Sequence, residues 1–279
     1  MATTQKAAAP AKKAKGTSSI GIKDAIWVIV VCGIIAFCNF FFNLGSPSNF
    51  VDGDTEGSPA NIWGTIFKGG IIVPVIHTLL LPVLFMAVER VIALRKCIGK
   101  DKLAKFVAKI KKDLKERNFD QALKDCDYQG GSVANVIRAN IMAYKEADAA
   151  TGLKKEVKIA RIQQAHEEAI AVEMPTLTMN LPIIATIVTL GTLTGLLGTV
   201  VGMIKSFQAL AQGGGGDSVE LSAGISEALI NTAFGIGTSW LAVVSYNFFT
   251  NRIDKIAFAL DEIGYSIAQT YAATHTDEA

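Results

Sequence analysis

The stretch MPTLTMNLPIIATIVTLGTLTGLLGTVVGMI, residues 174–204, decides the fold class because it contains no charged residue. It is longer than the ~20 apolar residues with which an α-helix crosses a bilayer. Residues 25–44 and 69–88 are also free of charge, and residues 221–251 contain only Glu227. The sequence therefore predicts an all-α fold and excludes a single soluble core. It indicates a polytopic membrane helix bundle with long transmembrane helices that extend into a helical cytoplasmic domain.

The charged residues between these stretches predict how the chain crosses the membrane. Residues 95–117 hold ten Lys or Arg against three acidic residues, whereas residues 45–63 hold three acidic residues and no Lys or Arg. Cytoplasmic loops carry an excess of Lys and Arg, so the basic N-terminus and the segment after residue 95 are expected in the cytoplasm. Residues 25–44 are interpreted as a retained span, with a cleaved signal peptide as the alternative.

The expected order of segments follows from these boundaries. It comprises a basic cytoplasmic tail (1–24), an extra N-terminal span (25–44), a periplasmic connector (45–68), a second span (69–94), a cytoplasmic helical insert (95–173), a third span (174–204), a periplasmic Gly-rich loop (205–220), a fourth span (221–251) and a cytoplasmic C-terminal tail (252–279). Helical patterns in the insert cover residues 101–125 and 153–173, on either side of Gly130 and Gly131. The C-terminal tail is expected to form a short amphipathic helix that frays. Asp217 and Glu220 resemble a capping box.

Composition and motifs exclude several classes of protein. A formal net charge of +2 is too small to favour nucleic acid as a partner. The four cysteines show no metal-ligand spacing and are expected to be free thiols or small apolar side chains. The glycine run 213–216 lacks the Lys and Ser/Thr of a nucleotide-binding loop, and no hydrolase motif is present. We therefore expect no enzymatic activity, metal or cofactor. The basic insert favours a solvated flank, with contact to membrane lipids as the alternative.

Glu227 is the first candidate functional residue. A carboxylate at the centre of a membrane helix costs at least ~2.5–3.5 kcal/mol and marks a functional site by default. The alternative is an interfacial glutamate in the first turn of the helix. Small and polar residues recur at helical spacing after it, and this stripe favours a proton path: Asn231, Gly235, Thr238, Ala242 and Ser245.

The third span carries a matching small-residue face. Its glycines allow two helix backbones to approach closely. They are Gly191, Gly195, Gly198 and Gly202, with Thr189, Thr192 and Thr199 nearby. The alternative is plain helix packing in which each hydroxyl bonds to its own backbone. Among the histidines, His77 in the second span is expected to be packed or interfacial rather than a proton relay, and His166 and His275 are expected to be solvated.

Two segments resemble the MotA/TolQ/ExbB proton-channel family and are most similar to ExbB. They are TLTGLLGTVVGMIKSFQALA (192–211) and GISEALINTAFGIGTSWLAVVSYNFFTNRID (224–254). The resemblance implies that Glu227 and Thr232 lie along a proton pathway. The third polar position of the family pattern corresponds to Leu190 and Gly191 in this chain, so the neighbouring Thr189 or Thr192 is the candidate substitute. The extra N-terminal span departs from the three-span plan of the family.

The resemblance also implies partners and a mechanism. A homo-oligomer, a pentamer in relatives, would surround ExbD-like or TolR-like single-span proteins and would energise a TonB-like protein for transport across an outer membrane. The place of action would be the inner membrane of a Gram-negative type cell. A TolQ-like or gliding-type motor subunit is one alternative. A non-conducting membrane scaffold, in which Glu227 is merely interfacial, is another.

Overall fold

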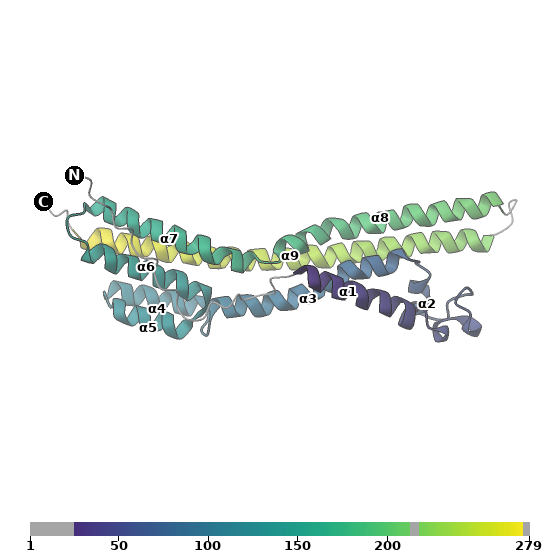
Figure 1. Cartoon of the computed structure of the whole chain (residues 1–279), viewed down its shortest axis with the longest axis horizontal. Helices are drawn as coiled ribbons and strands as arrows, with labels where there is room; N and C mark the ends of the chain where they lie inside the picture. Colours follow the sequence, from purple (N-terminus) through teal and green to yellow (C-terminus); the bar gives the residue numbers. More distant parts are fainter. Residues whose placement is uncertain (1–24, 213–217, 276–279) are drawn as a thin grey trace. The chain divides into compact units, whose positions relative to one another are not determined.

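The computed structural model describes residues 25–212 and 218–275, and most of these residues are helical (Figure 1). The predicted basic tail, the glycine run and Asp217 lie outside the described residues. The helices are α1 (Ala25–Cys38, continued as a π-helix over Asn39–Leu44), α2 (Ile62–Phe67), α3 (Ile72–Ile98), α4 (Leu103–Lys115), α5 (Phe119–Gln129), α6 (Gly131–Ala149), α7 (Lys155–Thr178), α8 (Leu181–Gln212) and α9 (Ser218–Thr274). Four helical stretches, one over each predicted span, are long and apolar enough to cross a membrane. The predicted all-α membrane helix bundle is thereby confirmed.

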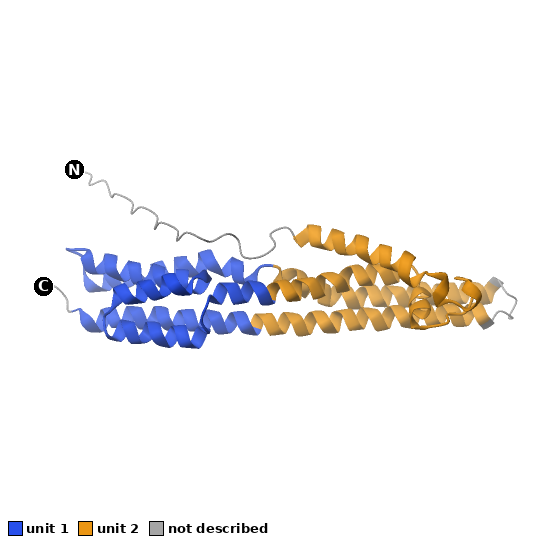
Figure 2. Cartoon of the chain, turned by 90° about the horizontal axis from the view of Figure 1, so that it is seen from below, with its two compact units in different colours: residues 1–21, 91–179, 251–279 blue, residues 22–90, 180–250 orange. Residues whose placement is uncertain are grey.

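The chain divides into two compact units, coloured in Figure 2. Unit 1 comprises residues 1–21, 91–179 and 251–279, and unit 2 comprises residues 22–90 and 180–250. Helices α3 and α9 contribute residues to both units. Unit 2 therefore contains the apolar stretches that the sequence predicts as spans, and unit 1 contains the helical insert and the end of α9.

Unit 2 is held together by apolar side chains from four helices. One core cluster joins α1, α3, α8 and α9 through Ala25, Val83, Met86, Ile184, Ile187 and Ala242. A second cluster joins the end of α1 to the start of α3, where the ring of Phe40 stacks on that of Phe67 with 4.7 Å between centroids. The extra N-terminal helix is thus packed into this unit.

The connector between α1 and α3 is ordered by asparagines. The amide of Asn49 donates to the backbone oxygens of Asn43 and Leu44, at 2.7 and 3.0 Å. The amide of Asn61 donates to the side-chain oxygen of Asn49, and the Asn61 oxygen caps α2 by accepting from the backbone N–H of Gly64. A side-chain oxygen at this position satisfies a backbone donor that the first turn leaves free.

The insert helices in unit 1 have other bounds than the sequence predicted. The pattern over residues 101–125 suggested one helical segment, but α4 ends at Lys115 and α5 begins at Phe119. Arg117 between them has φ 54°, and the Asn118 side chain caps α5. The expected break at Gly130 and Gly131 separates α5 from α6. A side chain on Gly131 would come within 2.5 Å of the Lys96 carbonyl oxygen, so glycine fits this turn.

The third and fourth spans also differ from the expected bounds. Helix α7 continues through residue 174 to Thr178, and α8 begins only at Leu181 because Asn180 adopts φ 65°. Helix α8 then runs past residue 204 to Gln212. The separate, frayed C-terminal helix is a wrong prediction, since α9 is one continuous helix of 57 residues. At 1.5 Å per residue its length is about 86 Å, nearly three times the ~30 Å hydrocarbon core.

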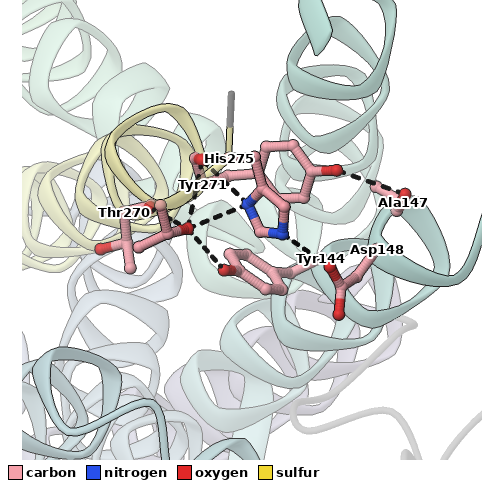
Figure 3. Close-up of polar contacts among 7 residues, drawn as sticks. Tyr144, Ala147, Asp148, Thr270, Tyr271 and His275 are labelled. Carbon is pink, nitrogen blue, oxygen red and sulfur yellow. Dashed lines mark hydrogen bonds and ion pairs between the residues drawn. The ribbon is translucent and has the colours of Figure 1, made fainter. Parts of the chain in front are cut away.

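The last turns of α9 remain ordered because they pack on α6 (Figure 3). The Tyr271 ring is buried and stacks on the His275 ring, with centroids 4.2 Å apart. Polar contacts to α6 accompany this ring stacking. His275 Nε2 lies 2.7 Å from the Asp148 carboxylate, and the hydroxyls of Tyr144 and Thr274 share a hydrogen bond. His275, which was expected to be solvated, is half-buried, with 31% of its side chain exposed.

His166 is likewise inside unit 1 rather than in solvent. Its side chain is 14% exposed, and its Nδ1 accepts a hydrogen bond from the Asn140 amide at 2.8 Å. Gly264 makes room for the ring, because a side chain there would come within 2.4 Å of it. The four cysteines are free, as expected. Burial raises the pKa of the Cys126 thiol to about 12, so this thiol is unreactive in the folded unit.

Candidate functional site

The glycines of α8 lie against α9 within unit 2. A side chain on Gly195 would come within 3.0 Å of the Gly235 Cα, and one on Gly235 within 2.6 Å of the Gly195 Cα. The other three glycines of the face have equally close neighbours on α9: Ser239 for Gly191, Asn231 for Gly198 and Ala228 for Gly202. The two backbones therefore touch, and polar side chains of α9 are held against α8.

Glu227 lies within this contact, close to Gly202 of α8 and Gly224 of α9 along the two helices, and is buried, with 8% of the residue exposed. Its two carboxylate oxygens accept hydrogen bonds from Lys205 of α8, with Nζ–O distances of 2.6 and 2.9 Å. Gly70, before α3, lies on another side of the carboxylate, where a side chain would come within 2.5 Å of Oε1. Three segments of the chain thus meet at the Glu227 carboxylate, while the Lys205 side chain is 51% exposed.

Asn231 lies one helical turn beyond Glu227 and is fully buried. Its amide donates to the Gly69 carbonyl oxygen at 2.9 Å, next to the glycine that contacts Glu227. Its Oδ1 is buried without a hydrogen-bond partner among the described residues. Such an atom can accept a hydrogen bond from water or from a passing proton carrier.

The hydroxyl residues lie further along the same interface. Thr232 is half-buried, and its hydroxyl donates to the Gly195 carbonyl oxygen over 3.4 Å. Thr192 donates to the Ser239 hydroxyl at 2.8 Å. Residues 227 and 239 are about 18 Å apart along α9, at 1.5 Å per residue. Polar groups therefore occupy more than half of the ~30 Å that a membrane core spans.

Other candidate residues lie apart from this group. Thr189 is exposed, and Thr199 bonds to the Leu196 carbonyl oxygen of its own helix, as the plain packing alternative holds. The half-buried His77 ring meets Phe234 edge-on, with centroids 5.5 Å apart. Its Nδ1 is buried and has no partner within the described ranges. The structure thus brings Glu227 and Asn231 together at one point and leaves Thr189 outside.

Lys205 was not predicted as a site residue, because the charge-free stretch before it suggested that the third span ends at residue 204. Helix α8 in fact continues through this position for nearly two more turns. A signal was present, because position 205 lies seven residues before the end of α8 at Gln212 and position 227 lies nine residues after the start of α9 at Ser218. Residues placed in this way lie opposite one another in a helical hairpin.

The site contains no arrangement suited to a metal. Over residues 25–212 and 218–275, no group of three or more His, Cys, Asp or Glu could hold a metal ion. The chemistry that the site offers is that of a carboxylate, an ammonium group, an amide and hydroxyls. Such groups exchange protons and hydrogen bonds.

The fold and this site define a polytopic helical membrane protein with an ion pair between two closely packed spans. Comparison with known proteins places the chain more closely. Residues 133–262, which include most of α6, all of α7 and α8 and much of α9, match the MotA/TolQ/ExbB proton channel family. The first five helices precede the matched segment.

Individual relatives carry both ExbB and TolQ names. The chain is 25% identical over 199 residues to an ExbB homolog of Methanothermobacter thermautotrophicus, a match that covers 70% of this chain and 66% of the relative. It is 30% identical over 138 residues to the Tol-Pal system protein TolQ of Pseudomonas aeruginosa, covering 50% of this chain and 59% of that protein. It is 34% identical over 84 residues to the biopolymer transport protein ExbB of Salmonella typhimurium, covering 30% of this chain and 34% of that protein. These matches span less than two thirds of each relative.

Proposed function

We propose that this chain is the ExbB-like subunit of a motor that uses the proton-motive force to energise a TonB-like protein for active transport across the outer membrane. The observation that carries the proposal is Glu227, a carboxylate buried between two apolar helices that belong to a proton channel family. An acid is costly in such a place, and proton transfer is a function that accounts for it. The biopolymer transport name of the Salmonella typhimurium relative supports the ExbB-like form.

The proposed pathway starts at Glu227 and follows α9 past Asn231 and Thr232 to Thr192 of α8. A proton that enters from the periplasm neutralises a carboxylate, and its release to the cytoplasm restores the charge. Each proton that crosses the membrane supplies ~2.3 kcal/mol per 100 mV of membrane potential. This free energy would move a partner protein relative to the ring.

The proposed assembly is a homo-oligomer, a pentamer, around ExbD-like single-span proteins in the inner membrane. Its support is the family of residues 133–262 and the many exposed apolar side chains on α8 and α9. Side chains of this kind need lipid or protein neighbours. Leu193, Leu197, Leu229 and Trp240 are examples.

A TolQ-like motor is the second candidate, because the Pseudomonas aeruginosa TolQ match covers half of this chain. The two functions differ in output, one serving nutrient uptake and the other envelope maintenance. Growth of the host on a nutrient that requires active outer-membrane uptake reports the first output and so distinguishes the two functions. Sensitivity of the same cells to detergent reports the second output.

The test compares wild type with Glu227→Gln at matched protein levels. Growth on that nutrient should fail in Glu227→Gln, because glutamine keeps the size of the side chain and cannot carry a proton. Glu220→Gln changes an exposed glutamate on the same helix and should grow normally. Normal growth of Glu227→Gln together with normal detergent resistance would reject both motors and favour a scaffold.

A further inference from the structure

Lys205 and Glu227 form an ion pair whose two members differ in freedom to move. The Glu227 side chain is 11% exposed and has Gly70 against its carboxylate. The Lys205 side chain is 51% exposed, and its four-carbon stem is flexible. The ammonium group can therefore leave for solvent while the carboxylate stays in place.

Loss of the ammonium group would change the state of Glu227. A buried carboxylate without a partner is costly, and a group in this position binds a proton instead of remaining charged. With Lys205 bonded to both of its oxygens, the carboxylate is both neutralised as a pair and blocked from an incoming proton. The Glu227 carboxylate can therefore be paired with the Lys205 ammonium group or can bind a proton, but not both at once.

Other charged groups near this end of unit 2 are turned elsewhere. Lys68 precedes α3, but its ammonium donates to the Glu56 carbonyl oxygen at 2.7 Å and lies 5.9 Å from the Phe50 ring centroid. Glu220 is exposed, about two turns before Glu227 on α9. On α3, His77 follows Gly70 by about two turns and meets Phe234.

We propose that Lys205 is the counter-ion that controls proton uptake by Glu227. While Lys205 is paired, Glu227 stays ionised and takes no proton. When the ammonium group swings into solvent, a proton from the adjacent water binds Glu227, which then remains buried as a neutral acid. Lys205 is thus a positioning residue, and its importance for transport rests on the proposed function.

Infrared spectroscopy of the full-length protein in lipid nanodiscs tests this directly, because a protonated carboxyl group has its own band. At pH 7 the wild type should lack a Glu227 carboxyl band, and Lys205→Met should show one. That band should disappear in the Lys205→Met, Glu227→Gln double variant.

Two further variants separate the counter-ion from a structural role. Lys205→Arg keeps the charge and should lack the Glu227 carboxyl band at pH 7, as the wild type does, whereas Lys205→Gln should show the band, as Lys205→Met does. Lys68→Met removes a nearby cation that does not touch Glu227 and should leave the Glu227 band unchanged. Absence of a Glu227 carboxyl band at pH 7 in both Lys205→Met and Lys205→Gln would overturn the proposal.

The spectroscopic result is independent of the growth test. A Glu227 carboxyl band at pH 7 in Lys205→Met, together with normal growth of Glu227→Gln, would support the counter-ion role of Lys205 and reject the motor function. Failed growth of Glu227→Gln, together with no Glu227 carboxyl band at pH 7 in Lys205→Met, would support the motor function and reject the counter-ion role of Lys205.

Discussion

Asp113 and Asp125 bring two carboxyl groups together inside unit 1, between α4 and α5. Both residues are buried, and each has one carboxylate oxygen without a hydrogen-bond partner among the described residues. Burial, followed by the hydrogen bond to Asp125 and its charge, raises the pKa of Asp113. Lys109 is 2.7 Å from Asp125 and opposes this rise only in part.

We predict that Asp113→Asn stabilises unit 1 at neutral pH and has little effect near pH 4. An acid with a raised pKa in the folded state binds more protons when folded, so its contribution to stability is lost as pH rises through that pKa. Asparagine keeps the shape and carries no charge to lose. Hydrogen exchange of the α4 and α5 amides in the full-length protein measures the effect, on the order of tenfold in protection per unit of pKa difference.

Glu146→Gln is the control for this prediction, because Glu146 is exposed on α6 of the same unit. Its exchange protection should match that of the wild type at both pH values. A gain for Asp113→Asn that is equally large at pH 4 and pH 7 would contradict the titration argument and would indicate a change in packing alone.

Single residues differ in how far the sequence could predict them. Glu227 could be predicted as a candidate because it is the only charged residue in the apolar stretch 221–251, and it is buried in the structure. Lys205 was missed because its role depends on the length of the turn between two helices. His166 was misjudged because the glycine that accommodates its ring, Gly264, lies 98 positions later in the chain. Contacts between distant positions leave no local pattern to find.

At the scale of elements, the α8–α9 contact offers a matched pair of glycines. A side chain on Gly235 would come within 2.6 Å of the Gly195 Cα, whereas one on Gly237 would have no neighbour within 4 Å. We predict that Gly235→Ala weakens the pairing of the two helices by about 1–3 kcal/mol, the usual cost of overpacking. Unfolding of the full-length protein in mixed micelles with increasing detergent strength measures this loss.

Gly237→Ala should unfold at the same detergent strength as the wild type or higher, because alanine favours a helix over glycine by up to about 1 kcal/mol. Both variants add one methyl group to the same helix, two positions apart. Equal behaviour of the two would mean that α8 and α9 do not touch at Gly235 in the membrane.

Helices as elements were more predictable than their ends. Each of the four apolar stretches lies on a helix that could cross a membrane, because length and lack of charge determine this property. The breaks at Arg117 and Asn180 were missed because both residues adopt a positive φ without being glycine. The continuity of α9 was missed because charges after residue 251 were interpreted as the end of a helix. In fact the buried side of α9 continues through Ile256, Ile263 and Tyr271.

At the scale of the whole molecule, the distribution of charge predicts which segments face the cytoplasm. Residues 95–117 hold ten Lys or Arg against three acidic residues, and residues 45–63 hold three acidic residues and no Lys or Arg. The membrane potential and the insertion machinery keep positive loops inside. The acidic connector and the basic insert should therefore lie on opposite sides of the membrane, separated by the span of α3.

Cysteine labelling tests this topology. In a variant whose four native cysteines are replaced by alanine, Glu56→Cys and Lys112→Cys each introduce one exposed thiol. A membrane-impermeant maleimide applied to intact spheroplasts should label Glu56→Cys at least about tenfold more than Lys112→Cys, because positively charged loops remain in the cytoplasm. After permeabilisation both should react equally, which controls for thiol reactivity. Preferential labelling of Lys112→Cys in intact spheroplasts would reverse the topology and place Lys205 and Glu227 at the cytoplasmic face, so that the proposed pathway would begin on the side where a proton should leave.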